Sequence, residues 1–425
     1  MRSLLFLIPH EVYGIPIFGA GIALACLAIG FIAWWLVSRK LPFSEIVAAL
    51  PVWGIAAAII VFVLPAVEQV DYDGNPIGLP IRGYGVMVLL GLVCGIGLSA
   101  HRGNQLGIVT DLVIGLGFWM MLGGVLGART FYVVQKWDEF QGDLISIVKL
   151  TEGGLVIYGG VLGGLLAGAA YCLKHRLPVL ATADLIAPGF LIGLALGRIG
   201  CLLHGCCFGG ICDANLPTIR FPVDSVPFHA QLETGRLLGI RIAGASLPAP
   251  IQSVEPGSAA EKLLIQPGEV LRFIRPRWSF PADASSPDSQ ETNQRPPDPE
   301  RKQTELMCDI VLADRTVTVS ANLTPQSSLP VHPTQIYAAI NALLLCILIW
   351  FLQPLTKRDG TVFLVAILLY AVSRFVLEGI RSDEIGQLGT SLTIAQLVAI
   401  GSALTAVIGI AALRALPARR AWSWQ

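Results

Sequence analysis

The sequence predicts an all-α polytopic membrane protein of about nine transmembrane helices, with a small α+β insert on the outer face. Three observations predict this fold class. Of the 425 residues, 54% are hydrophobic and only 14% are charged, whereas soluble domains carry roughly 25% charged residues. Apolar stretches of about 20 residues, the length that crosses a bilayer, recur along the chain. Residues 210–330 interrupt that pattern with polar, proline-rich sequence.

Nine apolar stretches are long enough to be transmembrane helices. They fall near residues 13–37, 45–65, 82–100, 110–134, 152–173, 181–203, 335–353, 361–380 and 391–413. The first ten residues, MRSLLFLIPH, lack the small-residue cleavage site of a secretory signal, so we expect them to lead into the first span. We interpret residues 1–78 as an accessory hairpin, and residues 79–209 and 331–425 as the two parts of one core.

Positive charge predicts the orientation of the spans. Basic residues occupy alternate loops and the tail, at Arg39, Lys40, Arg102, Lys174, Arg176, Lys357, Arg358, Arg414, Arg419 and Arg420. The positive-inside rule assigns these loops to the cytoplasm, with the N-terminus and the insert outside and the C-terminus inside. The formal net charge is zero, from 29 basic and 29 acidic residues. We therefore expect no nucleic acid as a partner.

The insert carries the pattern of a small folded domain. IQSVEPGSAAEKLLIQPGEVLRFI (251–274) predicts a strand, a turn, a short helix, a Pro-Gly turn and a second strand. This order resembles a PDZ domain, which we place at about 237–324 with two further strands in CDIVLADRTVTVSANL (308–323). A Pro, Ser and Asp-rich stretch, 280–303, is expected to be disordered. A PDZ-like insert implies an extracytoplasmic peptide as a candidate partner.

Two arginines lie deep inside predicted spans, where ionisable groups are costly and usually functional. At 1.5 Å per residue, Arg198 lies roughly 25 Å and Arg374 roughly 20 Å from the cytoplasmic ends of their helices, in the outer leaflet. Arg374 could be a structural partner of Glu378, four residues along the same face. The alternative is an anion site for a phospholipid phosphate, which the guanidinium fork binds bidentately. Tyr84, Tyr158, His332 and Gln335 are expected at the same level.

Glycine runs surround two further candidates. EGGLVIYGGVLGGLLAG (152–168) and MLGGVLGAR (121–129) indicate close helix packing, and a cavity for lipid is the alternative. Arg129 closes the second run and is a candidate substrate contact. Tyr158 lies within the first run, either as an interfacial tyrosine or as a hydroxyl directed at the reacting centre.

The stretch GRIGCLLHGCCFGG (197–210) raises the question of a metal or redox site. Its candidate ligands are Cys201, His204, Cys206 and Cys207, with Cys212 just beyond. The spacings between the cysteines are five, one and five, unlike the Cys-x2-Cys pairs of zinc sites. A disulfide on the oxidising side and reduced thiols that pack as small apolar groups are the other two interpretations. We favour the last, and expect no metal and no cofactor.

Five of these motifs together resemble the bacterial phosphatidylglycerol:prolipoprotein diacylglyceryl transferases. They are RGYG, EGGLVIYGGVLGG, GRIGCLLHGCCFGG, HPTQIY and YAVSRFVLEGIR, and the likeness covers residues 79–209 and 331–413. The resemblance implies an inner-membrane enzyme that moves diacylglyceryl from phosphatidylglycerol, a membrane lipid, to the lipobox cysteine of a lipoprotein precursor, releasing glycerol 1-phosphate. It also assigns residues: Tyr84 matches the essential tyrosine, Arg198 the signature arginine and Gly209 the closing glycine, while Tyr370, Arg374 and Glu378 match the late helix.

Three positions depart from the better-known members of that family. Tyr158 stands where they have a histidine thought to act as a base, Cys201 where they have asparagine, and Cys206 where they have glutamate. A tyrosine with a pKa near 10 is a poor base at neutral pH. We therefore expect phosphate binding by Arg198 and Arg374 to carry most of the catalysis, with the thiol proton passing to Tyr158 or to solvent. The alternative is a non-catalytic lipid-binding or lipid-sensing membrane protein that keeps the fold.

Overall fold

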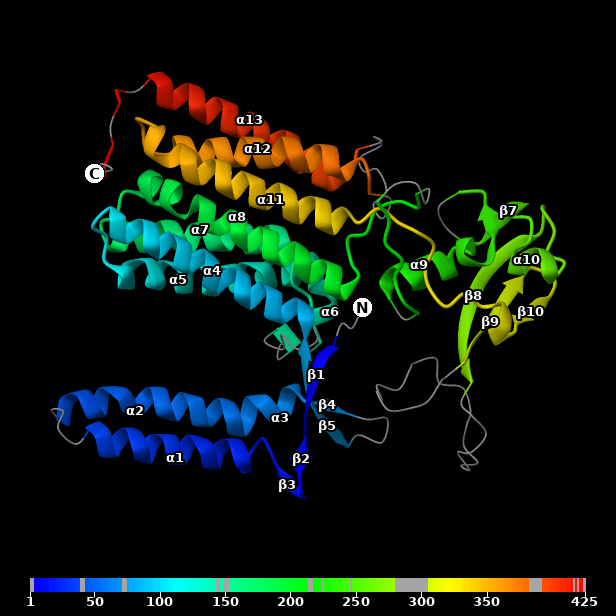
Figure 1. The fold of residues 1–425 in the computed structure, drawn as a ribbon, viewed down its shortest axis with the longest axis horizontal. Coiled ribbons are helices and arrows are strands. Elements are labelled where there is room, and N and C mark those ends of the chain that lie inside the picture. Colours follow the sequence, from blue (N-terminus) through cyan, green and yellow to red (C-terminus); the bar gives the residue numbers. More distant parts are fainter. Residues whose placement is uncertain are drawn as a thin grey trace. The chain divides into compact units, whose positions relative to one another are not determined.

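The computed structural model describes most of the chain as helices and strands (Figure 1). The described residues are 4–38, 43–70, 75–142, 146–147, 153–212, 217–223, 225–244, 247–279, 305–381, 392–415, 417–418 and 420–422. The chain divides into two units, one made of Met1–Gly83 and Phe221–Leu329, the other of Tyr84–Arg220 and Pro330–Gln425. The expected disordered stretch, 280–303, lies outside the described residues.

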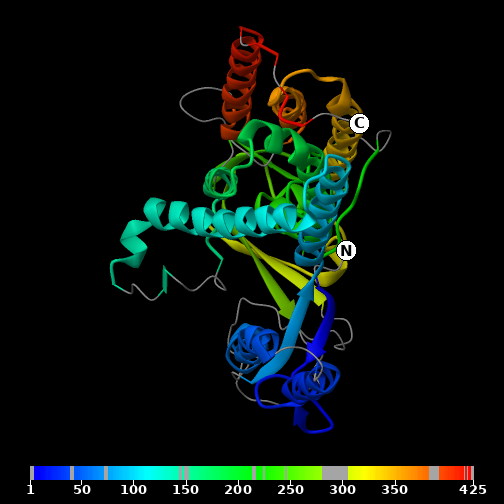
Figure 2. The ribbon, with the colours of Figure 1, turned by 90° about the vertical axis from the view of Figure 1, so that its left-hand side faces the viewer.

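The second unit is a bundle of long apolar helices. These are α4 (Gly83–Gln105), α5 (Thr110–Gln135), α7 (Ile157–Lys174), α8 (Val179–His204), α11 (Thr334–Leu352), α12 (Thr361–Glu378) and α13 (Ile394–Ala415), with a short α6 (Trp137–Phe140). Helix α5 packs along α7, α8 along α11, and α12 along α13. Figures 1 and 2 show α12 and α13 side by side in both views. The predicted core spans are therefore present as helices, with ends shifted by a few residues.

Glycine allows two helix pairs in this unit to pack closely. A Cβ on Gly127 of α5 would lie 2.9 Å from the Cα of Gly163 on α7, closer than real Cβ atoms approach. On the α4–α8 pair, a Cβ on Gly95 would lie 2.6 Å from the carbonyl oxygen of Gly189. Small residues let membrane helices approach until their backbones touch. The interpretation of the glycine runs as packing surfaces is confirmed.

A buried polar network joins the helices at the end of the bundle where α8 and α12 begin. The Asp184 carboxylate accepts hydrogen bonds from the backbone N–H groups of Gly360 and Phe363, both at 2.7 Å, and so caps α12. Gln353 donates to the carbonyl oxygen of Asp184 at 2.6 Å, and Arg102 donates to the side chain of Gln353 at 3.0 Å. These bonds satisfy backbone groups that a helix start would otherwise bury unpaired.

The N-terminal residues correct the prediction that the membrane part is all-α. Residues 4–82 form a three-stranded sheet in the order β1-β5-β4, a β2-β3 hairpin and apolar helices. Their bounds are β1 Leu4–Pro9, β2 Glu11–Val12, β3 Ile15–Pro16, α1 Ile22–Val37, α2 Phe43–Ala58, a π-helix Ile59–Val63, α3 Leu64–Val67, β4 Gln69–Val70 and β5 Pro76–Arg82. Residues 4–9 thus form a strand, because β1 pairs antiparallel with β5, more than 60 residues away. A short apolar run alone does not distinguish strand from helix.

Eight helices in the described residues are long and apolar enough to cross a membrane. The helix within the expected first span, 13–37, is shorter, since α1 has 16 residues and the strands precede it. The chain is therefore a polytopic helical membrane protein that also contains sheets.

The insert is an α+β domain, as predicted. Its elements are α9 Val226–Glu233, β6 Ile240–Ile242, β7 Ala249–Val254, α10 Ala259–Lys262, β8 Val270–Ser279, β9 Glu305–Leu312 and β10 Thr316–Val319. The five strands form one sheet in the order β10-β9-β8-β7-β6, with neighbours antiparallel. Phe228, Leu271 and Ile310 are fully buried in its core. The predicted strand–helix–strand unit is confirmed as β7, α10 and β8.

Candidate active site

A small hollow lies between α8, α11 and α12. Arg198 of α8 and Tyr370 and Arg374 of α12 line it, together with Asn341 and Ser373 and four apolar side chains. Arg198 interacts electrostatically with the Tyr370 hydroxyl. Asn341 donates to the Ser373 hydroxyl at 2.9 Å, which donates to the Tyr370 carbonyl oxygen at 3.0 Å. Two guanidinium groups therefore border one small, largely apolar space.

Glu378 holds one of these arginines in place. Its carboxylate is fully buried, and its Oε2 lies 2.7 Å from Arg374 Nη2 and 3.3 Å from Arg381 Nη1. The ion pair that the sequence offered as the structural role of Arg374 is thus present. The same arginine side chain remains 19% exposed and lines the hollow. Arg374 therefore pairs with Glu378 and is still accessible to a ligand in the hollow.

The loop that follows α8 is tied to α11 and to the end of α12. Gly209 donates its N–H to the His332 carbonyl oxygen at 3.0 Å and forms a β-bridge with Arg381. Gln335 donates to the Cys206 carbonyl oxygen, and Thr334 to that of Cys207, both at 2.7 Å. These contacts involve the backbone of His332 and the buried amide of Gln335, so both residues position the loop.

Glycine is required at position 209 for a steric reason. A Cβ there would lie 2.6 Å from the Cβ of His332 and 2.8 Å from Cγ2 of Thr334. No side chain fits at those distances without moving the strand-like contact. Gly209, the closing glycine of the signature, thus lets the loop after α8 pack closely against residues 332–334.

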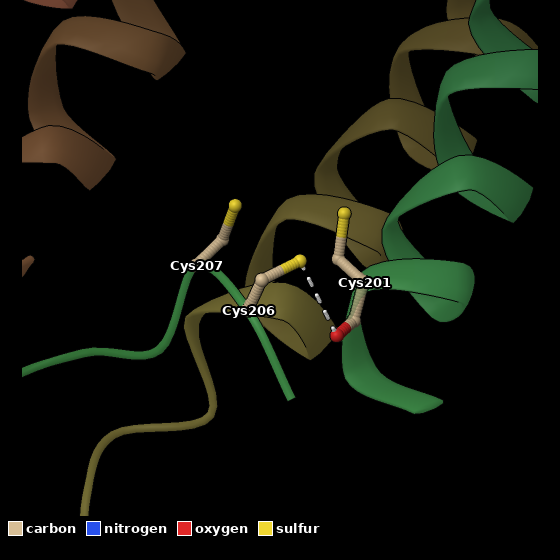
Figure 3. A group of neighbouring side chains, drawn as sticks. All are labelled: Cys201, Cys206 and Cys207. Carbon is tan, nitrogen blue, oxygen red and sulfur yellow. Dashed lines mark hydrogen bonds between the residues drawn. The ribbon is translucent and has the colours of Figure 1, made fainter. Parts of the chain in front are cut away.

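Three cysteines meet at the end of α8. The sulfur atoms of Cys201, Cys206 and Cys207 all lie within 4.8 Å of one another. Figure 3 shows them facing a common space, with the Cys206 thiol directed at the Cys201 carbonyl oxygen, 3.8 Å away. All nine cysteines fall within the described residues, and none of them forms a disulfide bond there. Hydrogen bonds from the other two thiols, with Arg381 and Arg198 nearby, lower the pKa of Cys207.

Tyr84 stands beside this cluster. It lies in the first turn of α4, its ring packs against Gly200 of α8, and its centroid is 6.3 Å from that of His204. It interacts electrostatically with all three cysteines and with Arg198. Tyr84, the cysteine cluster and the arginine-lined hollow therefore form one site at the end of the bundle where α4 begins and α8 ends.

Two predicted site residues lie elsewhere in the unit. Arg129 is 8% exposed, and its guanidinium donates to the carbonyl oxygens of Ser146, Ile147 and Gly153 at 2.6 to 2.9 Å. It fastens the chain that leads into α7. Tyr158 is the second residue of α7 and is 41% exposed. Neither is among the residues that line the hollow.

Sequence reasoning missed Arg381 and Asn341. Arg381 lies three residues after Glu378, within a motif already singled out, and the i,i+3 spacing could have indicated the second ion pair. Asn341 carries no such signal, because its contact with Ser373 joins two helices that are distant in sequence.

Known proteins resemble most of this chain in sequence. The sequence profile of the family described as prolipoprotein diacylglyceryl transferase matches residues 75–412. A phosphatidylglycerol–prolipoprotein diacylglyceryl transferase of Rhodopirellula baltica is 34% identical over 440 residues, covering 94% of this chain and 87% of that protein. A protein named phosphatidylglycerol–prolipoprotein diacylglyceryl transferase 2, from Clostridium perfringens, is 37% identical over 153 residues, covering 36% of this chain and 59% of that protein.

Proposed function

Because the chain belongs to the prolipoprotein diacylglyceryl transferase family, we propose that it transfers diacylglyceryl from phosphatidylglycerol to the lipobox cysteine of lipoprotein precursors. It is a transferase and a multi-pass protein of the inner membrane. The observation that carries the proposal is the shared hollow of Arg198 and Arg374 inside an apolar helix bundle. In such surroundings a phospholipid phosphate is the abundant anion that two guanidinium groups would hold.

The reaction would proceed by displacement at carbon. The lipobox sulfur attacks the glycerol carbon that bears the phosphate, a carbon–sulfur bond forms, and the carbon–oxygen bond to phosphate breaks. The electron pair leaves with glycerol 1-phosphate, and the thiol proton passes to Tyr158 or to solvent. Arg198 and Arg374 would stabilise the charge that develops on the leaving phosphate, which is commonly the largest contribution to such a rate. Low surrounding polarity strengthens this interaction.

The remaining site residues would orient these groups. Tyr370 contacts Arg198, and Glu378 fixes Arg374, so both act by positioning. Tyr84 interacts electrostatically with Arg198 and would contact the same headgroup. Gly209, His332 and Gln335 would hold the loop that closes the site. The roles of Tyr158 as proton acceptor and of Arg129 as a substrate contact are supported by their places in the glycine-rich sequence stretches alone.

The positions of basic residues support a site at the outer leaflet. Arg102, Lys174 and Arg414 lie in the last turns of α4, α7 and α13. Tyr84 lies in the first turn of α4, opposite Arg102. By the positive-inside rule the basic ends face the cytoplasm, so the site faces outward, as does the N-terminus if α1 completes a nine-span topology. The insert would then be extracytoplasmic, where a PDZ-like fold could bind a peptide.

The test is a transfer assay in vesicles. Purified protein is reconstituted with phosphatidylglycerol and a lipobox peptide, and the lipidated peptide is measured by mass. Arg374→Ala should lower transfer on the order of 10²-fold or more, the usual cost of one charge-stabilising group. Arg414→Ala is the matched control, because Arg414 lies in the last turn of α13 and does not line the hollow. Absence of lipidated peptide from the wild-type protein would favour the lipid-sensing alternative.

A further inference from the structure

The cysteine cluster at the end of α8 has the geometry of an incomplete metal site. Sequence spacing argued against metal, because the cysteines do not form Cys-x2-Cys pairs. In the structure the chain reverses direction tightly after α8, where Gly205 has φ +84° and Cys207 has φ +58°. Left-handed backbone at a residue other than glycine is uncommon and concentrates at functional sites. The reversal brings Cys206 and Cys207 back to face Cys201 (Figure 3).

We propose that Cys201, Cys206 and Cys207 bind one zinc ion whose fourth coordination position takes the lipobox thiol. The inference rests on the proposed function, since it assigns the step that deprotonates the nucleophile. Three protein ligands with one open position are the pattern of catalytic zinc, whereas structural zinc is closed by four. Thiolate ligands select zinc over the harder cations.

The distances suit this ion after a small contraction. Zinc–sulfur bonds of about 2.3 Å in a tetrahedron place sulfur atoms roughly 3.8 Å apart. The three sulfur atoms lie within 4.8 Å of one another, so shifts of about 1 Å complete the site. Cys206 and Cys207 lie in the loop beyond α8, where rotation of their side chains can supply this movement.

The surrounding charge also suits a zinc–thiolate centre. Three thiolates and one zinc ion carry a net charge of −1, which is costly in an apolar setting unless it is paired. Arg198 and Arg381 both act on Cys207, and Arg198 also acts on Cys201. Arg198 lines the phosphate hollow as well. A thiol held at the fourth position would therefore lie next to the phosphate that must leave.

The proposed step is balanced without any oxidant or reductant. On binding zinc, the lipobox thiol releases its proton to solvent, since a coordinating thiol is deprotonated. Its sulfur then forms the bond to the glycerol carbon as the carbon–oxygen bond breaks. The thioether product is neutral and a weaker ligand, so it dissociates. This route explains how a family member with Tyr158 in place of histidine can still activate a thiol.

The experiment uses full-length protein purified in nanodiscs without chelator. Zinc content is measured for the wild type, for Cys206→Ser, and for the control Cys94→Ser, whose cysteine lies about three turns along α4 from Tyr84. We expect zinc in the wild type and control, and its loss in Cys206→Ser with transfer lowered on the order of 10²-fold. Cys206→His should keep metal, because histidine is also a zinc ligand, which separates ligand loss from misfolding.

A second readout is independent of turnover. Cobalt-loaded protein should show sulfur-to-cobalt charge-transfer absorption, which should increase when lipobox peptide is added without phosphatidylglycerol, and stay unchanged with a peptide whose cysteine is serine. A metal-free wild type, a disulfide in the cluster, or Cys206→Ser transferring as fast as Cys94→Ser would overturn the proposal. If cobalt responds to the thiol but the wild type forms no lipidated peptide, the metal site stands and the transferase function fails.

Discussion

The buried carboxylate of Glu378 offers the sharpest test of how the site is held. Glu378→Gln keeps the shape of the side chain and one oxygen acceptor, but removes the charge that pairs with Arg374 and Arg381. Breaking a buried ion pair typically costs 3–5 kcal/mol. Because Arg374 is 19% exposed and can reach solvent, we expect a loss of about 2 kcal/mol in unfolding free energy, seen as a lower thermal midpoint.

The effect on transfer should exceed the effect on folding. A displacement of about 1 Å in a charge-stabilising group costs on the order of 10²-fold in rate, or about 2.7 kcal/mol. The assay is kcat/KM for lipidation of a lipobox peptide in phosphatidylglycerol vesicles. If Glu378 acts through Arg374, the double variant Glu378→Gln/Arg374→Ala will be no slower than Arg374→Ala alone. Additive losses, or a Glu378→Gln rate within twofold of wild type, would refute this reasoning.

Three further predictions concern single positions. Gly209→Ala should lower the free energy of unfolding by about 1–3 kcal/mol, the cost of overpacking, because its Cβ would meet His332. The thermal midpoint should fall accordingly, while Gly97→Ala, which has open space around it, should leave the midpoint unchanged. Burial raises the pKa of Cys308 from 9.0 to about 11. The contribution of the protonated thiol to the free energy of unfolding is therefore complete below pH 9, and about 3 kcal/mol of it is lost as the pH rises through 11. The difference in unfolding midpoint between the wild type and Cys308→Ala should shrink between pH 8 and pH 11. Asp184→Ala should lower the free energy of unfolding by about 2–4 kcal/mol, because it leaves two backbone N–H groups of α12 unpaired. Asp184→Asn should show a smaller loss, and circular dichroism measures both.

Helix positions in the core were predictable because burial in lipid demands long apolar segments with internally satisfied backbones. The prediction that Arg198 and Arg374 lie at one level followed from the rise per residue, and the hollow that both line confirms it. The strand β1 was not predictable, since its identity depends on pairing with β5 across the intervening helices. The local sequence pattern of β1 carries no information on its pairing with β5.

The site shows the same division between local and distant determinants. The Arg374–Glu378 pair follows from helical spacing and was anticipated. The bonds from Thr334 and Gln335 to the cysteine loop join residues more than 120 positions apart. No periodicity links those segments, so only the folded chain reveals that His332 and Gln335 act on the loop and not on an open cavity.

The departures from the family signature make more sense together than singly. The family resemblance implies that Tyr158 of α7 stands in place of a histidine base, and that Cys201 and Cys206 stand in place of an asparagine and a glutamate beside Cys207. Taken alone, each change weakens the case for catalysis. In the structure the two new cysteines and Cys207 converge within 4.8 Å beside Arg198. If that implication holds, ligation of a metal by the three cysteines, as proposed above, would replace the histidine in activating the nucleophile. If zinc serves only to deprotonate the lipobox thiol, adding Tyr158→His to the Cys206→Ser variant should restore its rate of peptide lipidation.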